Sequence, residues 1–166
     1  MNQRPRRNRK SESIRKMVQE TNLSVNDFIY PLFIVDRSNI KEEISSMPNV
    51  FRWCLNLMLK EIESCVNLGI NSFVLFPAVD DSLKDKVATY SFQKENFYLK
   101  AISKIKTEFP SICLMSDVAM DPYSSDGHDG LVENGKILND ETLPILSNMS
   151  IAQAQAGIDI IGPSDM

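Results

Sequence analysis

Four carboxylates and the chain's only histidine lie within residues 116–130. They are Asp117, Asp121, Asp126, Asp129 and His128. Carboxylates accept hydrogen bonds, transfer protons and bind hard cations. An apolar run, residues 112–115, leads directly into this acidic segment. Because a buried strand that enters a polar turn places its last side chains at the carboxyl edge of a sheet, we expect a functional site here.

Asp117 is the first candidate, because it ends the predicted strand. Its carboxylate can accept a hydrogen bond from the amino group of a substrate and orient it. The alternative is an aspartate that caps the loop through nearby backbone amides, and the residues alone favour that interpretation. Asp126 and His128 could join a hydrated ion site, and a turn-stabilising role beside Gly127 and Gly130 is the alternative. The acidic spacing does not fit the EF-hand template, so a calcium loop of that type is excluded.

Four short apolar runs predict the strands that position these residues. They span residues 28–35, 70–76, 112–117 and 158–161. Pro31 lies inside the first run, so pairing there either begins after the proline or occurs at a sheet edge.

Apolar residues at helical spacing predict a helix between each pair of strands. The helices span residues 55–66, 97–105 and 140–156. Gly69, Pro110 and Gly157 stand where these helices end. We expect Asp140 to cap the last helix and Pro144 to fall near its first turn.

Two smaller elements complete the pattern. Ile14, Met17 and Val18 predict a short helix after Ser11. Asn134-Gly135, between two apolar pairs, predicts a hairpin after the acidic segment. The chain thus divides into an amino-terminal arm, residues 1–27, and a β/α region, residues 28–166.

The alternation of strands and helices predicts an α/β fold with parallel strands. Four β/α units fit either an open doubly wound sheet or part of an eight-unit barrel, which typically needs about 250 residues. Periodicity alone leaves both architectures open.

Composition is that of a globular protein, with 166 residues, 43% of them hydrophobic, and a net charge of −4. No apolar stretch approaches the roughly 20 residues of a membrane span, and the basic start lacks the apolar part of a secretory signal. The three cysteines form no CxxC pair, so we expect reduced thiols. We therefore expect a cytoplasmic protein, or one from an organelle interior, with no membrane partner.

Positive charge gathers near the amino terminus. The residues are Arg4, Arg6, Arg7, Arg9 and Lys10. A solvated tail and an RNA-binding arm are two interpretations. Because the net charge is acidic, we expect no nucleic-acid partner; salt-sensitive RNA binding that is lost on trimming residues 1–10 would favour the second interpretation.

Several short motifs occur in order along nearly the whole chain. They are Arg4-Pro5-Arg6-Arg7, Ile29-Tyr30-Pro31-Leu32-Phe33, Ser46-Met47-Pro48, Leu75-Phe76-Pro77, Leu138-Asn139-Asp140-Glu141-Thr142 and Pro163-Ser164-Asp165-Met166. With the acidic segment, this series resembles the porphobilinogen synthase (5-aminolevulinate dehydratase) family in its aspartate-rich form. The resemblance implies a TIM (β/α)₈ barrel, with about the first four β/α units in residues 28–166 after an extended arm.

Members of that family join two molecules of 5-aminolevulinate, with loss of water, into porphobilinogen for haem and other tetrapyrroles. The resemblance therefore implies a hydro-lyase without an organic cofactor, and a homo-octamer whose arm wraps a neighbouring subunit. Family members hold substrate as Schiff bases on two lysines of later strands. Neither lysine has a counterpart here, so we expect an amino-terminal half that is inactive alone. A non-catalytic remnant that binds partner chains is the alternative.

The resemblance also assigns site residues. It places Asp117 and Ser164 in the substrate pocket, with Phe76 in the pocket wall. The alternatives are an ordinary polar residue at a strand end for Ser164 and a core side chain for Phe76.

Zinc-dependent members have cysteines where this sequence has Ala119, Asp121 and Asp129. Thiolates favour zinc, whereas carboxylates favour hard ions. We therefore expect no active-site zinc, and either Mg²⁺ or a monovalent ion at Asp121 and Asp129, or no ion.

Half a barrel would leave strand edges and one sheet face exposed. We expect unpaired edges on the first and fourth predicted strands, and an isolated chain that is molten, poorly soluble or self-associated.

Overall fold

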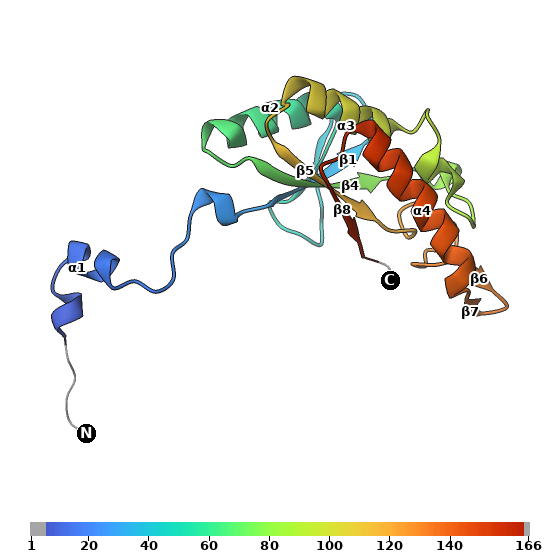
Figure 1. Ribbon diagram of the computed structural model, residues 1–166. Helices are drawn as coiled ribbons and strands as arrows, with labels where there is room; N and C mark the ends of the chain where they lie inside the picture. Colours follow the sequence, from blue (N-terminus) through green and yellow to red (C-terminus); the bar gives the residue numbers. More distant parts are fainter. Residues whose placement is uncertain (1–5, 165–166) are drawn as a thin grey trace.

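The structure, a computed structural model, describes residues 6–164. A six-stranded sheet carries helices along one side, and an extended amino-terminal arm leads into it (Figure 1). Arg4 and Pro5 of the first motif, and Asp165 and Met166 of the last, lie outside the described residues. No helix in the described part is both long and apolar enough to cross a membrane.

The sheet contains six strands and a separate hairpin follows the acidic segment. The strands are β1 (Tyr30–Val35), β2 (Lys41–Glu43), β3 (Phe51–Trp53), β4 (Ser72–Ala78), β5 (Cys113–Val118) and β8 (Ile160–Pro163), and the hairpin is β6 (Val132–Glu133) with β7 (Lys136–Ile137). The helices are α1 (Glu12–Met17), α2 (Leu55–Asn67), α3 (Phe97–Glu108) and α4 (Asn139–Ala156), with 3₁₀ turns η1 (Arg7–Arg9), η2 (Val25–Asp27), η3 (Asp81–Leu83) and η4 (Thr89–Phe92). All four predicted strands and all predicted helices are confirmed, with shifts of a few residues at their ends.

The strand order is β2-β3-β1-β4-β5-β8, and β1, β4, β5 and β8 are parallel neighbours in chain order. A doubly wound sheet reverses its strand order and carries helices on both faces. Here the order does not reverse along these four strands, and α2, α3 and α4 lie on one side of the sheet (Figure 1). The sheet is therefore singly wound over the described residues.

The two faces of the sheet differ in burial. Alternate side chains such as Leu32, Leu75 and Leu114 are fully buried in the core that the helices cover. The opposite face carries half-buried side chains, including Phe33 and Phe76, whose rings stack with centroids 5.2 Å apart. Parallel sheets are normally covered on both faces. The second face, called the open face below, has no covering layer among residues 6–164.

Helix ends follow the sequence signals in most places. The Ser11 hydroxyl accepts a hydrogen bond from the Ile14 amide (3.3 Å), and Gly69 and Gly157 adopt positive φ angles of 90° and 104°. The predicted cap of α4 is wrong. Leu138 occupies that position without a side-chain cap, and Asp140 lies in the first turn, where its charge suits the helix dipole.

Pro144 lies beyond the first turn of α4, so its predicted placement is also wrong. It lacks the N–H that would bond the Asp140 carbonyl four residues earlier.

All three cysteines are free thiols, as expected.

The expected free edge on β1 is wrong, because β3 pairs with it in parallel. The short strands β2 and β3 lack an apolar run, so periodicity did not reveal them. Lys41 helps to join them, because its Nζ lies 4.4 Å from the Phe51 ring centroid and 4.3 Å from that of Trp53. On the other side of the sheet β8 is the last strand over the described residues.

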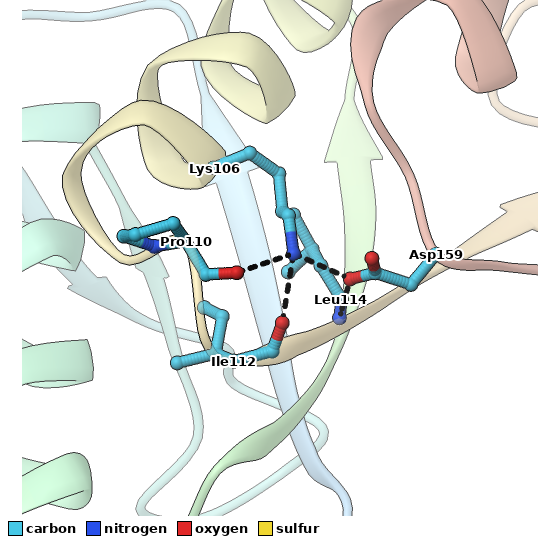
Figure 2. Close-up of polar contacts among 5 residues, drawn as sticks. All are labelled: Lys106, Pro110, Ile112, Leu114 and Asp159. Carbon is cyan, nitrogen blue, oxygen red and sulfur yellow. Dashed lines mark hydrogen bonds and ion pairs between the residues drawn. The ribbon is translucent and has the colours of Figure 1, made fainter.

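An ion pair joins the amino ends of β5 and β8 to α3 (Figure 2). Lys106 Nζ donates to Asp159 Oδ2 (2.8 Å) and to the carbonyls of Ile112 (2.8 Å) and Pro110 (3.4 Å). The same Asp159 oxygen accepts from the Leu114 amide at 2.8 Å. This cluster, called the Lys106–Asp159 clasp below, satisfies strand-end groups that the sheet leaves unpaired.

Candidate active site

Asp117 and Ser164 are in contact at the carboxyl edge of the sheet. Asp117 alternates along β5 with buried Ser116 and Val118, so its side chain lies on the open face. Parallel pairing of Asp117 with Gly162 brings the residue after β8 alongside. The Ser164 hydroxyl then donates to Asp117 Oδ1 at 2.6 Å. The two residues assigned by resemblance thus form one polar pair.

The Asp117 backbone is held from the helix side of the sheet. Gln153 of α4 donates from Nε2 to the Asp117 carbonyl oxygen at 2.9 Å. The hydroxyl of Ser116 donates to Gln153 Oε1 at 2.6 Å. Gln153 has no signal in the sequence, because it is a single polar residue in a helical stripe.

The loop before η4 is tied to the acidic segment by its backbone. The Asp85 amide donates to the Tyr123 carbonyl (3.2 Å), and the Ser125 amide donates to the Asp85 carbonyl (3.1 Å). Asp85 Oδ1 accepts from the amides of Val87 (3.1 Å) and Thr89 (2.9 Å). Burial favours a higher pKa for Asp85, but these amide bonds outweigh it and lower the pKa. Asp85 is a structural aspartate that our sequence analysis missed.

Asp121 and Asp129 lie close enough to repel each other. Partial desolvation of the Asp121 carboxyl, then the charges of Asp129 and Asp117, raise the pKa of Asp121, and Lys84 opposes this rise. Over residues 6–164, however, no three histidine, cysteine or acidic side chains are grouped closely enough to hold a metal ion. The geometry therefore offers two carboxylates, and any ion there would keep several water ligands.

Asp126 and His128 do not join these two carboxylates in a ligand group. Both residues are exposed, the Asp126 amide donates to the Ser124 hydroxyl (3.2 Å), and Gly127 has a φ of 65°. These features fit the turn-stabilising interpretation.

Two buried tyrosines lie near Asp117. The Tyr98 hydroxyl donates to the Leu75 carbonyl at 2.9 Å. The Tyr123 hydroxyl has no hydrogen-bond partner within the described part of the chain. Burial raises the pKa of both phenols, which are therefore neutral near pH 7.

Comparison with known proteins establishes the family. The profile of the delta-aminolevulinic acid dehydratase family matches residues 2–166. The chain belongs to this family. The resemblance read from the ordered motifs is therefore confirmed.

Individual relatives agree with the family profile. A delta-aminolevulinic acid dehydratase of Chlamydia pneumoniae is 48% identical over 166 residues, which is 100% of this chain and 50% of the relative. One from Bradyrhizobium diazoefficiens is 47% identical, covering 98% of this chain and 46% of the relative. The chloroplastic enzyme of Glycine max is 43% identical, covering 100% and 40%. The chain spans about half the length of these relatives.

A solved structure has the same fold over this length. The crystal structure of delta-aminolevulinic acid dehydratase (porphobilinogen synthase) from Toxoplasma gondii ME49, in complex with the reaction product porphobilinogen, matches with a TM-score of 0.94 and 43% identity. The match covers 100% of this chain and 47% of that one.

Beside the candidate site, a cavity of about 320 Å³ opens at the carboxyl ends of β1 and β4 in this delta-aminolevulinic acid dehydratase family member. Half of its lining residues are charged, among them Asp36, Arg37, Arg52 and Asp80. Asp117 and Ser164 do not line it, so the polar pair faces outward from the open face rather than into this hollow.

Proposed function

We propose that residues 1–166 supply the amino-terminal half of a porphobilinogen synthase, which condenses two molecules of 5-aminolevulinate with loss of water. Family membership supports the reaction class. The single observation that supports a site in this half is the contact between Ser164 Oγ and Asp117 Oδ1 at 2.6 Å, at the sheet edge where α/β enzymes place their chemistry.

In this proposal Asp117 accepts a hydrogen bond from the substrate amino group, and the Ser164 hydroxyl helps to hold the substrate. The Schiff-base lysines lie outside residues 1–166. Lys84, Lys104 and Lys106 each pair with a carboxylate at 2.9, 3.3 and 2.8 Å. Each of these three side chains is therefore engaged in an ion pair.

We further propose that β1, β4, β5 and β8 are four strands of a (β/α)₈ barrel, in residues 28–166, and that residues 1–27 form its arm. Three features support this: the sequential strand order, the helices on one side, and the open face. In a barrel, that face would be the inner one, packed against side chains of the remaining strands.

For the ion, we propose a hydrated Mg²⁺ at Asp121 and Asp129, with a monovalent ion as the second choice. The donor set supports this, because both side chains offer hard oxygen atoms and Ala119 offers no ligand. Their mutual repulsion would be relieved by a cation. When bound, the ion would supply positive charge and ordered water beside the substrate pocket.

We also propose a homo-octamer in the cytoplasm or an organelle interior. The arm extends away from the sheet and exposes apolar side chains, with Met17 83% and Leu23 74% accessible (Figure 1). Exposed apolar side chains in a row are typical of a segment that packs on another subunit.

The test is formation of porphobilinogen from 5-aminolevulinate by the complete product of the gene that encodes this chain. Asp117→Asn should lower kcat/KM about 10²-fold or more, because the amide is a poor acceptor for a charged amino group. Asp140→Asn, an exposed change on α4, is the matched control and should stay within about twofold. No porphobilinogen from the wild-type product, or full activity of Asp117→Asn, would refute the proposal.

A further inference from the structure

Gln153 is a buried polar residue on the face of α4 that packs against the sheet. It is 1% exposed, and Leu146 and Met149, on the same face of α4, are buried too. Burying an amide is unfavourable unless its hydrogen bonds are made. Both ends of this amide are bonded, to the Ser116 hydroxyl (2.6 Å) and to the Asp117 carbonyl (2.9 Å).

These two partners are consecutive residues where β5 reaches the carboxyl edge. The side chain of Ser116 points toward the helices, and that of Asp117 points to the open face. Gln153 therefore forms hydrogen bonds to the strand from the helix side of the sheet. These bonds hold the peptide whose orientation sets the direction of the Asp117 carboxylate. Rotation of that peptide would break the bond to Gln153 and would turn the carboxylate away from Ser164.

An apolar side chain of the same shape would fill this place, but alone it would leave the Ser116 hydroxyl and the Asp117 carbonyl without their partner. Replacing both members of a buried polar pair by apolar groups is often neutral or stabilising. The amide is thus not required for packing. An apolar residue would lack the hydrogen bond that fixes the orientation of the strand end.

We propose that Gln153 is a positioning residue, which sets the direction of the Asp117 carboxylate through the Asp117 carbonyl. The inference rests on the proposed function for its effect on turnover. Its geometric part, the separation of Asp117 from Ser164, stands independently of activity.

The kinetic test uses the complete gene product with Gln153→Met, which keeps the length of the side chain and removes both hydrogen bonds. We expect kcat to fall about 10-fold to 10²-fold, because small misplacements of an orienting group have large effects on rate. The melting temperature should also fall by several degrees, because the Ser116 hydroxyl and the Asp117 carbonyl lose their partner. A purely structural role predicts the lower melting temperature together with an unchanged kcat, measured well below that temperature.

Gln153→Glu gives a sharper readout. The protonated acid can donate to the Asp117 carbonyl and accept from Ser116, as the amide does, whereas the ionised form cannot donate. We therefore expect its kcat, relative to the wild type at the same pH, to fall as the pH rises and the new carboxyl ionises. Gln155→Glu, on the exposed side of α4, is the matched control and should follow the wild-type profile.

A crystal structure of Gln153→Met separates this inference from the proposed function. We expect the distance from Asp117 Oδ1 to Ser164 Oγ to exceed hydrogen-bonding range, against 2.6 Å in the native chain. An unchanged distance would overturn the inference, whatever the activity. An inactive wild-type product with a lengthened distance would refute the proposed function and leave the positioning role supported. A wild-type kcat for Gln153→Met would also overturn the inference that Gln153 is a positioning residue.

Discussion

At the scale of single residues, the site combines one carboxylate held by neighbours with others that repel one another. The Asp117 carboxylate accepts a hydrogen bond from the Ser164 hydroxyl, and its backbone carbonyl accepts one from the Gln153 amide. Asp121 has the opposite environment, with Asp129 and Asp117 near it. The same residue type thus occupies two environments, a hydrogen-bonded one at Asp117 and one with nearby like charges at Asp121.

Asp121→Asn should raise stability slightly at neutral pH in the absence of Mg²⁺. Desolvation and the charges of Asp129 and Asp117 raise the folded pKa of Asp121, so its ionised form is destabilising once the pH passes that raised pKa. Solvent screening limits the gain to less than about 1 kcal/mol, and the gain should vanish at acid pH, where the carboxyl is protonated. Thermal unfolding of the complete gene product at two pH values measures this effect.

The same variant should lose thermal stabilisation by added Mg²⁺, because one of two carboxylate donors is gone. Glu133→Gln, an exposed neutralisation in β6, is the control and should keep the Mg²⁺ response. Equal Mg²⁺ responses in the wild type and Asp121→Asn would rule out the ion site at this residue.

At the scale of elements, β5 is fastened at both ends. The Lys106–Asp159 clasp joins its amino end to β8 and α3 (Figure 2). Gln153 holds its carboxyl end. Parallel strands can slip along one another, and a one-residue slip moves every side chain to the other face. Fixed ends therefore keep Asp117 on the open face and opposite Gly162.

Lys106→Met should destabilise the protein by about 1 to 2 kcal/mol. The change leaves the Ile112 carbonyl and Asp159 without their donor, and partial exposure of Asp159 moderates the loss. The matched control is Lys104→Met, which removes an exposed pair with Glu108 on the same helix and should change stability by less than about 0.5 kcal/mol. Urea unfolding measures both, and equal effects would contradict a special role for the clasp.

The contribution of the clasp should also depend on pH. Burial favours a higher pKa for Asp159, but the bonds from Lys106 and the Leu114 amide outweigh it and lower the pKa. A lowered folded pKa means that the stabilisation is present above the ordinary aspartate range and is lost as the pH falls through the folded value. Asp159→Asn should therefore be less stable than the wild type at pH 7, and the gap should narrow in acid.

At the scale of the whole molecule, the open face and the arm both expose apolar surface. The Phe33 and Phe76 rings stack on that face, and Met17 and Leu23 of the arm are largely accessible. A parallel sheet with one bare face lacks half of the burial that normally stabilises it. We therefore expect residues 1–166 by themselves to associate through these surfaces.

The isolated 166-residue polypeptide should self-associate and form no porphobilinogen. Sedimentation measures the first property and a porphobilinogen assay the second. Phe33→Ser combined with Phe76→Ser should reduce association, because it removes the apolar stack from the open face. Leu68→Ser, also exposed, is the control and should not. A monodisperse monomer with a sharp unfolding transition, or measurable product, would contradict this prediction.

Local sequence patterns predicted most of the helices and strands. They failed where contacts between segments distant in sequence determine the structure. The runs at residues 28–35 and 112–117 indicated strands because buried parallel strands are continuously apolar. The charged strand β2 gave no such signal, since its pairing depends on β3 and on the rings around Lys41. Likewise, Gln153 is recognised only through partners more than thirty residues away.

Residue order alone determined the β/α alternation, the carboxyl-edge acidic segment and the family, because apolar periodicity and short motifs are local properties of a chain. Tertiary structure decided that the helices lie on one side, that β3 covers β1, and that Ser164 meets Asp117. Those outcomes depend on which strands pair and in which register. Pairing is settled by burial and hydrogen bonding between segments far apart in sequence, which no local pattern encodes.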